Sequence, residues 1–251
     1  MNKSNDYDKF AKMRQESIVK GVYKPHVYVE KPMMKKIIPN LKDKKVLLLG
    51  CGTGEESIFI EENGAKEIIG IDVSKESINI ANKTYSKHKF YTGDMHKTDF
   101  EDNEFDFIYS SLAIHYSENP ETVIKEINRI LKPNGQLQLS LAHPVRWGIS
   151  DVEIDNIPTK IIGFTEDKNN PRIYGSYSSY KKQKHDFKTG ERLEFYTASP
   201  SFYFNLLKDN GFIIEEFQES KVIDECKEVD INYYNRFNEF PQFMAFLASK
   251  K

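Results

Sequence analysis

A short run of glycines is the first feature of this 251-residue sequence that could do chemistry. The run reads Gly50-Cys51-Gly52-Thr53-Gly54 and follows an aliphatic segment, Lys45 to Leu49. Glycines after a strand let a ligand approach the backbone closely, and the helix that follows offers unpaired N–H groups at its start. A dinucleotide fingerprint G-x-G-x-x-G needs a third glycine where this chain has Glu55. The loop therefore predicts a ligand site that is poorly suited to a pyrophosphate.

Two acidic residues follow the next two β-branched runs. Asp72 comes about 20 residues after the loop, where a carboxylate can accept hydrogen bonds from both hydroxyls of a ribose. Asp94 can accept a hydrogen bond from the amino group of an adenine, with Ile71, Val73 or Met95 against the ring. The simpler interpretations are that Asp72 caps the helix after it and that Asp94 lies in an ordinary turn.

Two histidines are the candidate catalytic groups. His115 and His143 follow the fourth and fifth predicted strands, so both should lie on one rim as possible general bases for an acceptor. The alternative for each is a loop histidine hydrogen-bonded to the backbone. Cys51 fits a small packing residue better than a nucleophile, and His96 is expected on the surface. No group of His, Cys, Asp and Glu has the spacing of a metal site, so we expect no metal.

The elements that must position these residues follow from the pattern between residues 43 and 142. Short strand-like runs alternate there with segments of helical period, which is typical of a parallel sheet covered by helices. The predicted strands are Lys45–Leu49, Glu67–Ile71, Lys89–Thr92, Phe105–Ser110 and Gln136–Leu141. The predicted helices are Glu55–Asn63, Lys75–Ser86 and Pro120–Leu131, the last ended by a turn at Lys132-Pro133-Asn134-Gly135.

The rest of the chain predicts three further parts around this core. Upstream helices are expected at Asp6–Lys20 and Glu30–Ile38. The aromatic-rich stretch His143–Pro200 is interpreted as an inserted cap with a hairpin of Ile173–Tyr180 and Arg192–Tyr196. A helix, Ser201–Asn210, and two strands, Phe212–Phe217 and Phe243–Ala248, come last. The predicted division is an N-terminal helical lid (1–39), a core (40–142), a substrate cap (143–200) and the remainder of the core (201–251).

Three segments resemble, in order, the motifs of class I S-adenosylmethionine (SAM)-dependent methyltransferases. VLLLGCGTG resembles the first motif, IIGIDVSKESINIA the ribose-binding motif, and YTGDMHKTDFEDNEFDFIYSSLAIHY the adenine-binding motif with the fourth strand. ILKPNGQLQLSLAHP is similar to the segment leading into the fifth strand. The nearest branch of the family is the small-molecule one that includes the ubiquinone/menaquinone-biosynthesis ("type 11") methyltransferases.

The resemblance implies an α/β, Rossmann-like seven-stranded sheet whose last strand is antiparallel, with helices on both faces. SAM would lie across the carboxyl ends of the first strands, and S-adenosylhomocysteine (SAH) would be the product. The cofactor residues implied are Gly50, Cys51, Gly52, Gly54, Asp72, Val73, Asp94, Met95, Ser110 and Ser111. One departure is Leu48-Leu49, where many relatives carry an acid, so contact with the methionine amino group would rely on backbone carbonyls.

We therefore expect methyl transfer from SAM to an O, N or C nucleophile of a small molecule. A net charge of -2 supplies no general basic field for nucleic acid. Two cysteines and the absence of an apolar run near 18 residues favour a cytoplasmic protein without membrane contact. We expect a monomer or homodimer. The alternatives are an RNA or protein methyltransferase, a non-catalytic SAM-binding regulator and a nicotinamide dehydrogenase.

Overall fold

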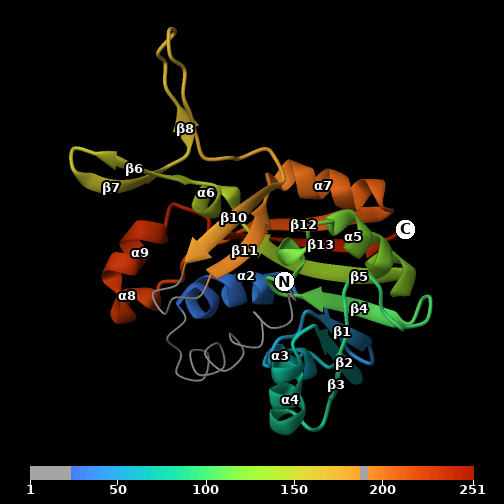
Figure 1. The fold of residues 1–251 in the computed structure, drawn as a ribbon. Coiled ribbons are helices and arrows are strands. Elements are labelled where there is room, and N and C mark those ends of the chain that lie inside the picture. Colours follow the sequence, from blue (N-terminus) through green and yellow to red (C-terminus); the bar gives the residue numbers. More distant parts are fainter. Residues whose placement is uncertain (1–23, 187–191) are drawn as a thin grey trace.

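The structure is a computed structural model that describes residues 24–186 and 192–251. A seven-stranded sheet lies at its centre, in the order β12-β13-β5-β4-β1-β2-β3 (Figure 1). The strands are β1 (Lys45–Leu49), β2 (Glu67–Asp72), β3 (Lys89–Thr92), β4 (Phe105–Ser110), β5 (Leu131–Ala142), β12 (Phe212–Glu219) and β13 (Phe243–Lys250). Strand β1 is parallel to β2 and β4, whereas β13 is antiparallel to β5 and β12. The predicted Rossmann-like sheet with its antiparallel last strand is confirmed.

Helices cover both faces because each central strand buries both rows of its side chains. In β1, Leu47 and Leu49 join one hydrophobic core, and Val46 and Leu48 join the other. The first core lies under α5 (Pro120–Ile130) and α7 (Pro200–Asp209). The second lies under α2 (Lys31–Lys36), α3 (Glu56–Glu62) and α4 (Lys75–Thr84). A strand that is buried on both faces reads as a continuous aliphatic run, which is why the sequence revealed these strands.

Side-chain caps begin three of the helices where the sequence placed them. The side chains of Ser74, Asn119 and Ser199 accept hydrogen bonds from backbone N–H groups in the first turns of α4, α5 and α7. The predicted helix Asp6–Lys20 lies outside the described residues. The helix predicted at Glu30–Ile38 is α2, preceded by a π-helical turn, η1 (His26–Glu30).

The turn predicted at residues 132–135 is a bulge within β5. Leu131 pairs with Phe105, and the pairing resumes at Gln136 opposite Phe107, so the residues between them loop out of the ladder. Asn134 has a φ of 61°, in the left-handed region that Asn tolerates well. The turn chemistry was correctly predicted, but the strand continues on both sides of it.

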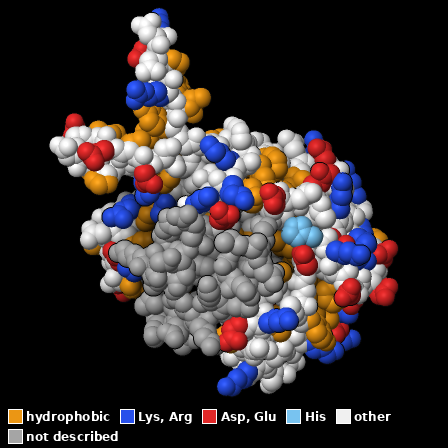
Figure 2. All heavy atoms as spheres, in the orientation of Figure 1, with side chains coloured by type: hydrophobic (Ala, Val, Ile, Leu, Met, Phe, Trp, Pro, Cys, Tyr) orange, Lys and Arg blue, Asp and Glu red, His pale blue; other side chains and the backbone are white. Residues whose placement is uncertain are grey.

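The segment after β5 divides into a packed part and a projecting part. It contains α6 (Pro144–Trp147), β6 (Ser150–Ile154), β7 (Ile157–Ile161), β8 (Gly163–Phe164), β9 (Ile173–Tyr174), β10 (Lys181–Asp186) and β11 (Arg192–Thr197). The ribbons β6–β7 and β8–β9 extend away from the sheet, whereas β10–β11 lies beside it (Figure 1). Apolar side chains on the projecting ribbons are exposed (Figure 2); they include Ile154, Ile157, Phe164 and Ile173.

The prediction of Ile173–Tyr180 as the first strand of the hairpin is wrong. The partner of β11 is the lysine-rich β10, with Lys182 opposite Tyr196, and Ile173–Tyr174 pairs with β8 instead. A solvated edge strand needs no apolar alternation, and lysines are common there, so hydrophobic pattern could not reveal it. The sequence Lys188-Thr189-Gly190 between the two predicted strands favours a turn, and it lies outside the described residues.

After β12 come two short helices that the sequence analysis did not predict. They are α8 (Cys226–Val229) and α9 (Ile231–Phe237), and α9 starts at an Asp230 side-chain cap. The backbone N–H of Ile223 donates to the carbonyl of Tyr28, and Val222 and Cys226 are buried in the second core. This segment therefore packs against η1, far from it in the sequence.

Candidate cofactor-binding site

The glycine loop is held against the ends of β2 and β4. The N–H groups of Gly50 and Cys51 both donate to the carbonyl of Ile71, at 2.9 Å each. Gly50 has a φ of 70°, and a Cβ on it would lie 2.3 Å from the Cβ of Ala113. No other residue fits at position 50 without moving the loop that follows β4.

Asp72 is tied directly to this loop. Its Oδ2 accepts a hydrogen bond from the N–H of Gly52, and its Oδ1 accepts one from the N–H of Ser74, both at 2.9 Å. The carboxylate thus stabilises the start of α4 as well as the loop, so its local bonds agree with the simpler interpretation too. It remains half-buried at the carboxyl edge of the sheet, where a ribose could reach it.

Asp94 lies at the end of β3, one strand further along the same edge. Its Oδ1 accepts a hydrogen bond from the N–H of His96 and lies 2.6 Å from the Nδ1 of that ring. The Nε2 of His96 lies 2.7 Å from the Oγ of Ser117. His96 therefore links the turn after β3 to the loop after β4, a bridging role that the sequence did not indicate. The Asp94 side chain is 62% exposed.

Val73 and Met95 flank these acids as half-buried side chains, and Met95 packs against the first core. Ser110 and Ser111 are both buried at the end of β4. The hydroxyl of Ser110 donates to the carbonyl of Leu49, and that of Ser111 donates to Glu30. Their hydroxyls thus make contacts inside the protein.

The sequence analysis missed a buried polar network that joins η1 to β5 and to the residue after β4. Glu30 Oε1 accepts hydrogen bonds from Ser111 (2.9 Å) and Ser140 (2.6 Å). Its Oε2 lies 2.9 Å from Nδ1 of His26, whose Nε2 lies 3.3 Å from Glu56 Oε1. Burial alone would lower the pKa of His26, but Glu30 and Glu56 raise it to about 9. The only signal in the sequence was the spacing of His26 and Glu30 by four residues.

His115 is buried at the same edge, in η2 (Ile114–Tyr116). Its Nδ1 accepts a hydrogen bond from the backbone N–H of Ala142 at 3.3 Å, and its ring contacts those of Tyr116 and Phe195. A ring nitrogen that accepts an N–H carries no proton, so the neutral ring holds its proton on Nε2. In this state His115 can donate a hydrogen bond from Nε2 but cannot act there as a base.

His143 has both ring nitrogens in contacts with the protein. Nδ1 accepts the N–H of Val145 as the cap of α6, and Nε2 lies 2.9 Å from Glu219 Oε1. Burial lowers its pKa, against the opposing effect of Glu219. These contacts favour the backbone-bonded alternative for His143.

The aromatic residues of the packed part of the insertion fill space beside this edge. Trp147 donates its indole N–H to the carbonyl of Gln242, and its ring packs edge-on to Phe195. The ring of Tyr180 stacks on Tyr196 and Phe202. Tyr180 and Phe202 pack against the first core, and Trp147 packs against the second.

A comparison with known protein families fits this arrangement. Residues 47–139 match the family model described as "Methyltransferase domain". This part of the chain is therefore similar to a methyltransferase domain. The matched residues span the glycine loop, Asp72, Asp94 and His115, and they end within β5.

Individual relatives match the methyltransferase domain over part of their length. An uncharacterised protein of Haemophilus influenzae is 34% identical over 152 residues, which cover 57% of this chain and 58% of that protein. The demethylmenaquinone methyltransferase of Bacillus velezensis is 32% identical over 120 residues, 44% of this chain and 52% of that enzyme. The chain thus spans little more than half the length of these curated relatives.

A solved structure has the same fold over a larger share. The SAM-dependent methyltransferase of Mesorhizobium loti superposes with a TM-score of 0.68 at 20% identity, covering 88% of this chain and 97% of that one. In the described residues, no helix is both long enough and apolar enough to cross a bilayer.

Proposed function

We propose that this protein transfers the methyl group of SAM to an oxygen, nitrogen or carbon atom of a small molecule, leaving SAH. The observation that carries the proposal is the hydrogen bond from the Gly52 N–H to Asp72. This bond holds the carboxylate that we propose binds a ribose beside the glycine loop, at the point where β1 lies between β2 and β4. Ligands of open α/β sheets bind at such switch points.

The side chains at this edge suit the cofactor. Asp72 offers a carboxylate to a ribose diol, and Asp94 offers one to an adenine amino group beside Met95. Bound SAM would supply an electrophilic methyl group on its sulfonium. The protein's share is then to align the acceptor and exclude water.

His115 is proposed to orient the acceptor. With its proton on Nε2, the ring can donate to an acceptor oxygen, such as a carbonyl or a phenolate. Phe195 contacts the same ring, so the proposed acceptor site lies under β10–β11. The rival hypothesis is that His115 or His143 acts as a general base, as the sequence analysis predicted.

A small-molecule acceptor is supported by the similarity to demethylmenaquinone methyltransferases and by the net charge of -2. We propose no nucleic-acid partner, and a monomer or homodimer acting in the cytoplasm.

The test combines cofactor binding with turnover. SAM and SAH should each raise the melting temperature, since a ligand at about 100 times its Kd adds roughly 2.7 kcal/mol of stability, and NAD should not. Formation of SAH is then measured with a panel of phenols, quinols, amines and carboxylates. Absence of a shift with both SAM and SAH contradicts the proposal, whereas binding without turnover on any acceptor indicates a SAM-binding regulator.

Hydrogen exchange locates the acceptor. An acceptor analogue added to the SAH complex should protect amides of β11 and η2. Protection confined to other segments contradicts an acceptor site under β10–β11.

A further inference from the structure

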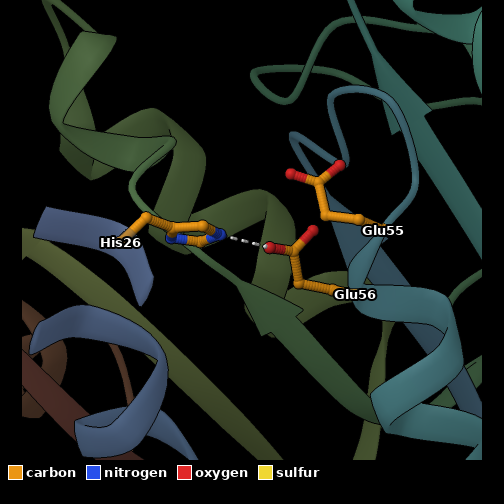
Figure 3. A group of neighbouring side chains, drawn as sticks. All are labelled: His26, Glu55 and Glu56. Atoms are coloured by element: carbon orange, nitrogen blue, oxygen red, sulfur yellow. Dashed lines mark ion pairs between the residues drawn. The ribbon is translucent and has the colours of Figure 1, made fainter. Parts of the chain in front are cut away.

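The cluster of His26, Glu55 and Glu56 has the arrangement of a metal site. One ligand atom from each residue, an imidazole nitrogen and two carboxylate oxygens, lies within 4.8 Å of the other two. Figure 3 shows the His26 ring directed at Glu56. The carboxylate of Glu55, the residue before Glu56, lies beside them. Bond lengths of about 2.0–2.2 Å place the ligands of one ion roughly 3–4.5 Å apart, so small side-chain movements suffice.

His26 is the observation that points to a ligand. The side chain is only 2% exposed and its Nε2 is directed into the cluster. Nε2 and Glu56 Oε1 form an ion pair at 3.3 Å, and a cation bound between them would replace that pair. A buried imidazole nitrogen in this position is suited to coordinate an ion.

The Nδ1 side of the His26 ring resembles the outer shell of a metal site. Metal-binding histidines usually direct their second nitrogen to a carboxylate, which fixes the ring. Here Nδ1 lies 2.9 Å from Glu30 Oε2, and Glu30 is itself held by the hydroxyls of Ser111 and Ser140. Two successive layers of polar groups therefore orient Nε2 toward the two carboxylates.

Access for an ion is also present. Glu55 and Glu56 line a cavity of about 270 Å³ between α2 and α3, together with Lys31, Lys35, Tyr85 and Tyr109. A site of three protein ligands leaves positions for water or for a ligand oxygen, and the cavity has room for them.

We propose that His26, Glu55 and Glu56 bind one divalent transition-metal ion, with Glu30 positioning His26. The mixed nitrogen and oxygen donors suit Zn²⁺ or Mn²⁺ better than Mg²⁺. The ring gives up its Nε2 proton to the solvent when it coordinates the ion. The ion would join η1 to the start of α3, beside the glycine loop.

The experiment uses the full chain, stripped with a chelator and saturated with SAH. Titration calorimetry with ZnCl₂ and with MnCl₂ should show one tight site per chain, and Co²⁺ should give visible d–d absorption bands. His26→Gln and Glu55→Gln should each weaken the Kd at least tenfold. Glu55 is only half-buried, so its variant tests the site even if His26→Gln fails to fold.

A matched control is provided by a second histidine–glutamate pair. His88 Nε2 lies 3.3 Å from Glu61 Oε2, the same separation, and neither residue belongs to the cluster. His88→Gln should leave metal affinity within about twofold.

The proposal is overturned if no tight site is found, or if His88→Gln weakens binding as much as Glu55→Gln does. It is also overturned if Glu55→Gln weakens SAH binding while no metal binds, because the cluster would then serve the cofactor. Metal binding and SAH binding are measured separately, so either can fail without the other.

Discussion

The central sheet and the insertion after β5 use β-structure in opposite ways. Strands β1, β4 and β5 bury side chains on both faces, whereas β6 to β9 pair only with one another and leave Phe164 and Ile173 71% and 84% exposed. Hydrophobic burial stabilises the first region, while the projecting ribbons depend mainly on local hydrogen bonds. The lesson is that strand assignment alone does not tell which part of this chain sustains the fold.

The largest test of this contrast removes a phenylalanine from each region. Phe107→Ala in β4, 1% exposed, should lower the free energy of unfolding by about 3–5 kcal/mol because it leaves a cavity. Phe164→Ala in β8 should change it by no more than about 0.5 kcal/mol. Urea unfolding measures both, and equal losses would show that β8 is part of the cooperative unit.

A second test uses acid on the sheet region. Burial alone would raise the pKa of Glu126 in α5, but hydrogen bonds from Arg129 and Thr98 lower it to about 2. Because the folded pKa lies below the unfolded one, the stabilisation is present above about pH 4.5 and is lost as the pH falls toward 2. Its full size is at most about 3 kcal/mol.

Urea unfolding between pH 6 and pH 2 should show this loss, and Glu126→Gln should flatten the slope. Glu121→Gln, which removes an exposed ion pair on the same helix, is the control and should leave the slope unchanged. An unaltered slope in Glu126→Gln would assign the acid sensitivity to other groups.

The third test compares the two ends of the sheet strands. Asp72→Ala should weaken SAH binding by roughly 1.5–3 kcal/mol, because bonds to a charged carboxylate are lost. Asp106 also accepts a backbone N–H, from Lys45 at the opposite end of the strands. Asp106→Ala should therefore leave SAH affinity unchanged in the folded protein. Calorimetry decides, and similar losses in both would mean that Asp72 acts only through stability.

The smallest effect is expected at the junction of the two regions. His143→Asn should change turnover less than about threefold, since Asn also caps helices and the ring nitrogens of His143 face Val145 and Glu219. A general base contributes about 100-fold or more. A loss of that size, with an unchanged melting temperature, would restore His143 as a base.

The sequence predicted the sheet region well because its signals are local and physical. Burial on both faces marked β1 and β4, and segments of helical period marked α4 and α5. The position of Asp72 and Asp94 at one edge of the sheet was predictable because parallel strands bring their carboxyl ends together there.

The remaining features depend on contacts that no local pattern encodes. The contact of His26 with Glu56 joins residues 30 positions apart, and that of Glu30 with Ser140 joins residues 110 apart. Strand β10, which pairs with β11, is an edge strand without apolar alternation, so no local hydrophobic pattern reveals the pairing. Both are properties of the assembled tertiary structure.

The place of β13 has a consequence for the order in which the chain can assemble. This strand lies between β5 and β12, so those two strands cannot join the same sheet until residues 243–250 are available. During synthesis, β5 therefore presents an unpaired edge while 100 residues, from 143 to 242, are added. Such an edge is a template for pairing with other chains. A nascent chain halted before Phe243 should consequently be more prone to aggregation, and a greater burden for chaperones, than one released eight residues later.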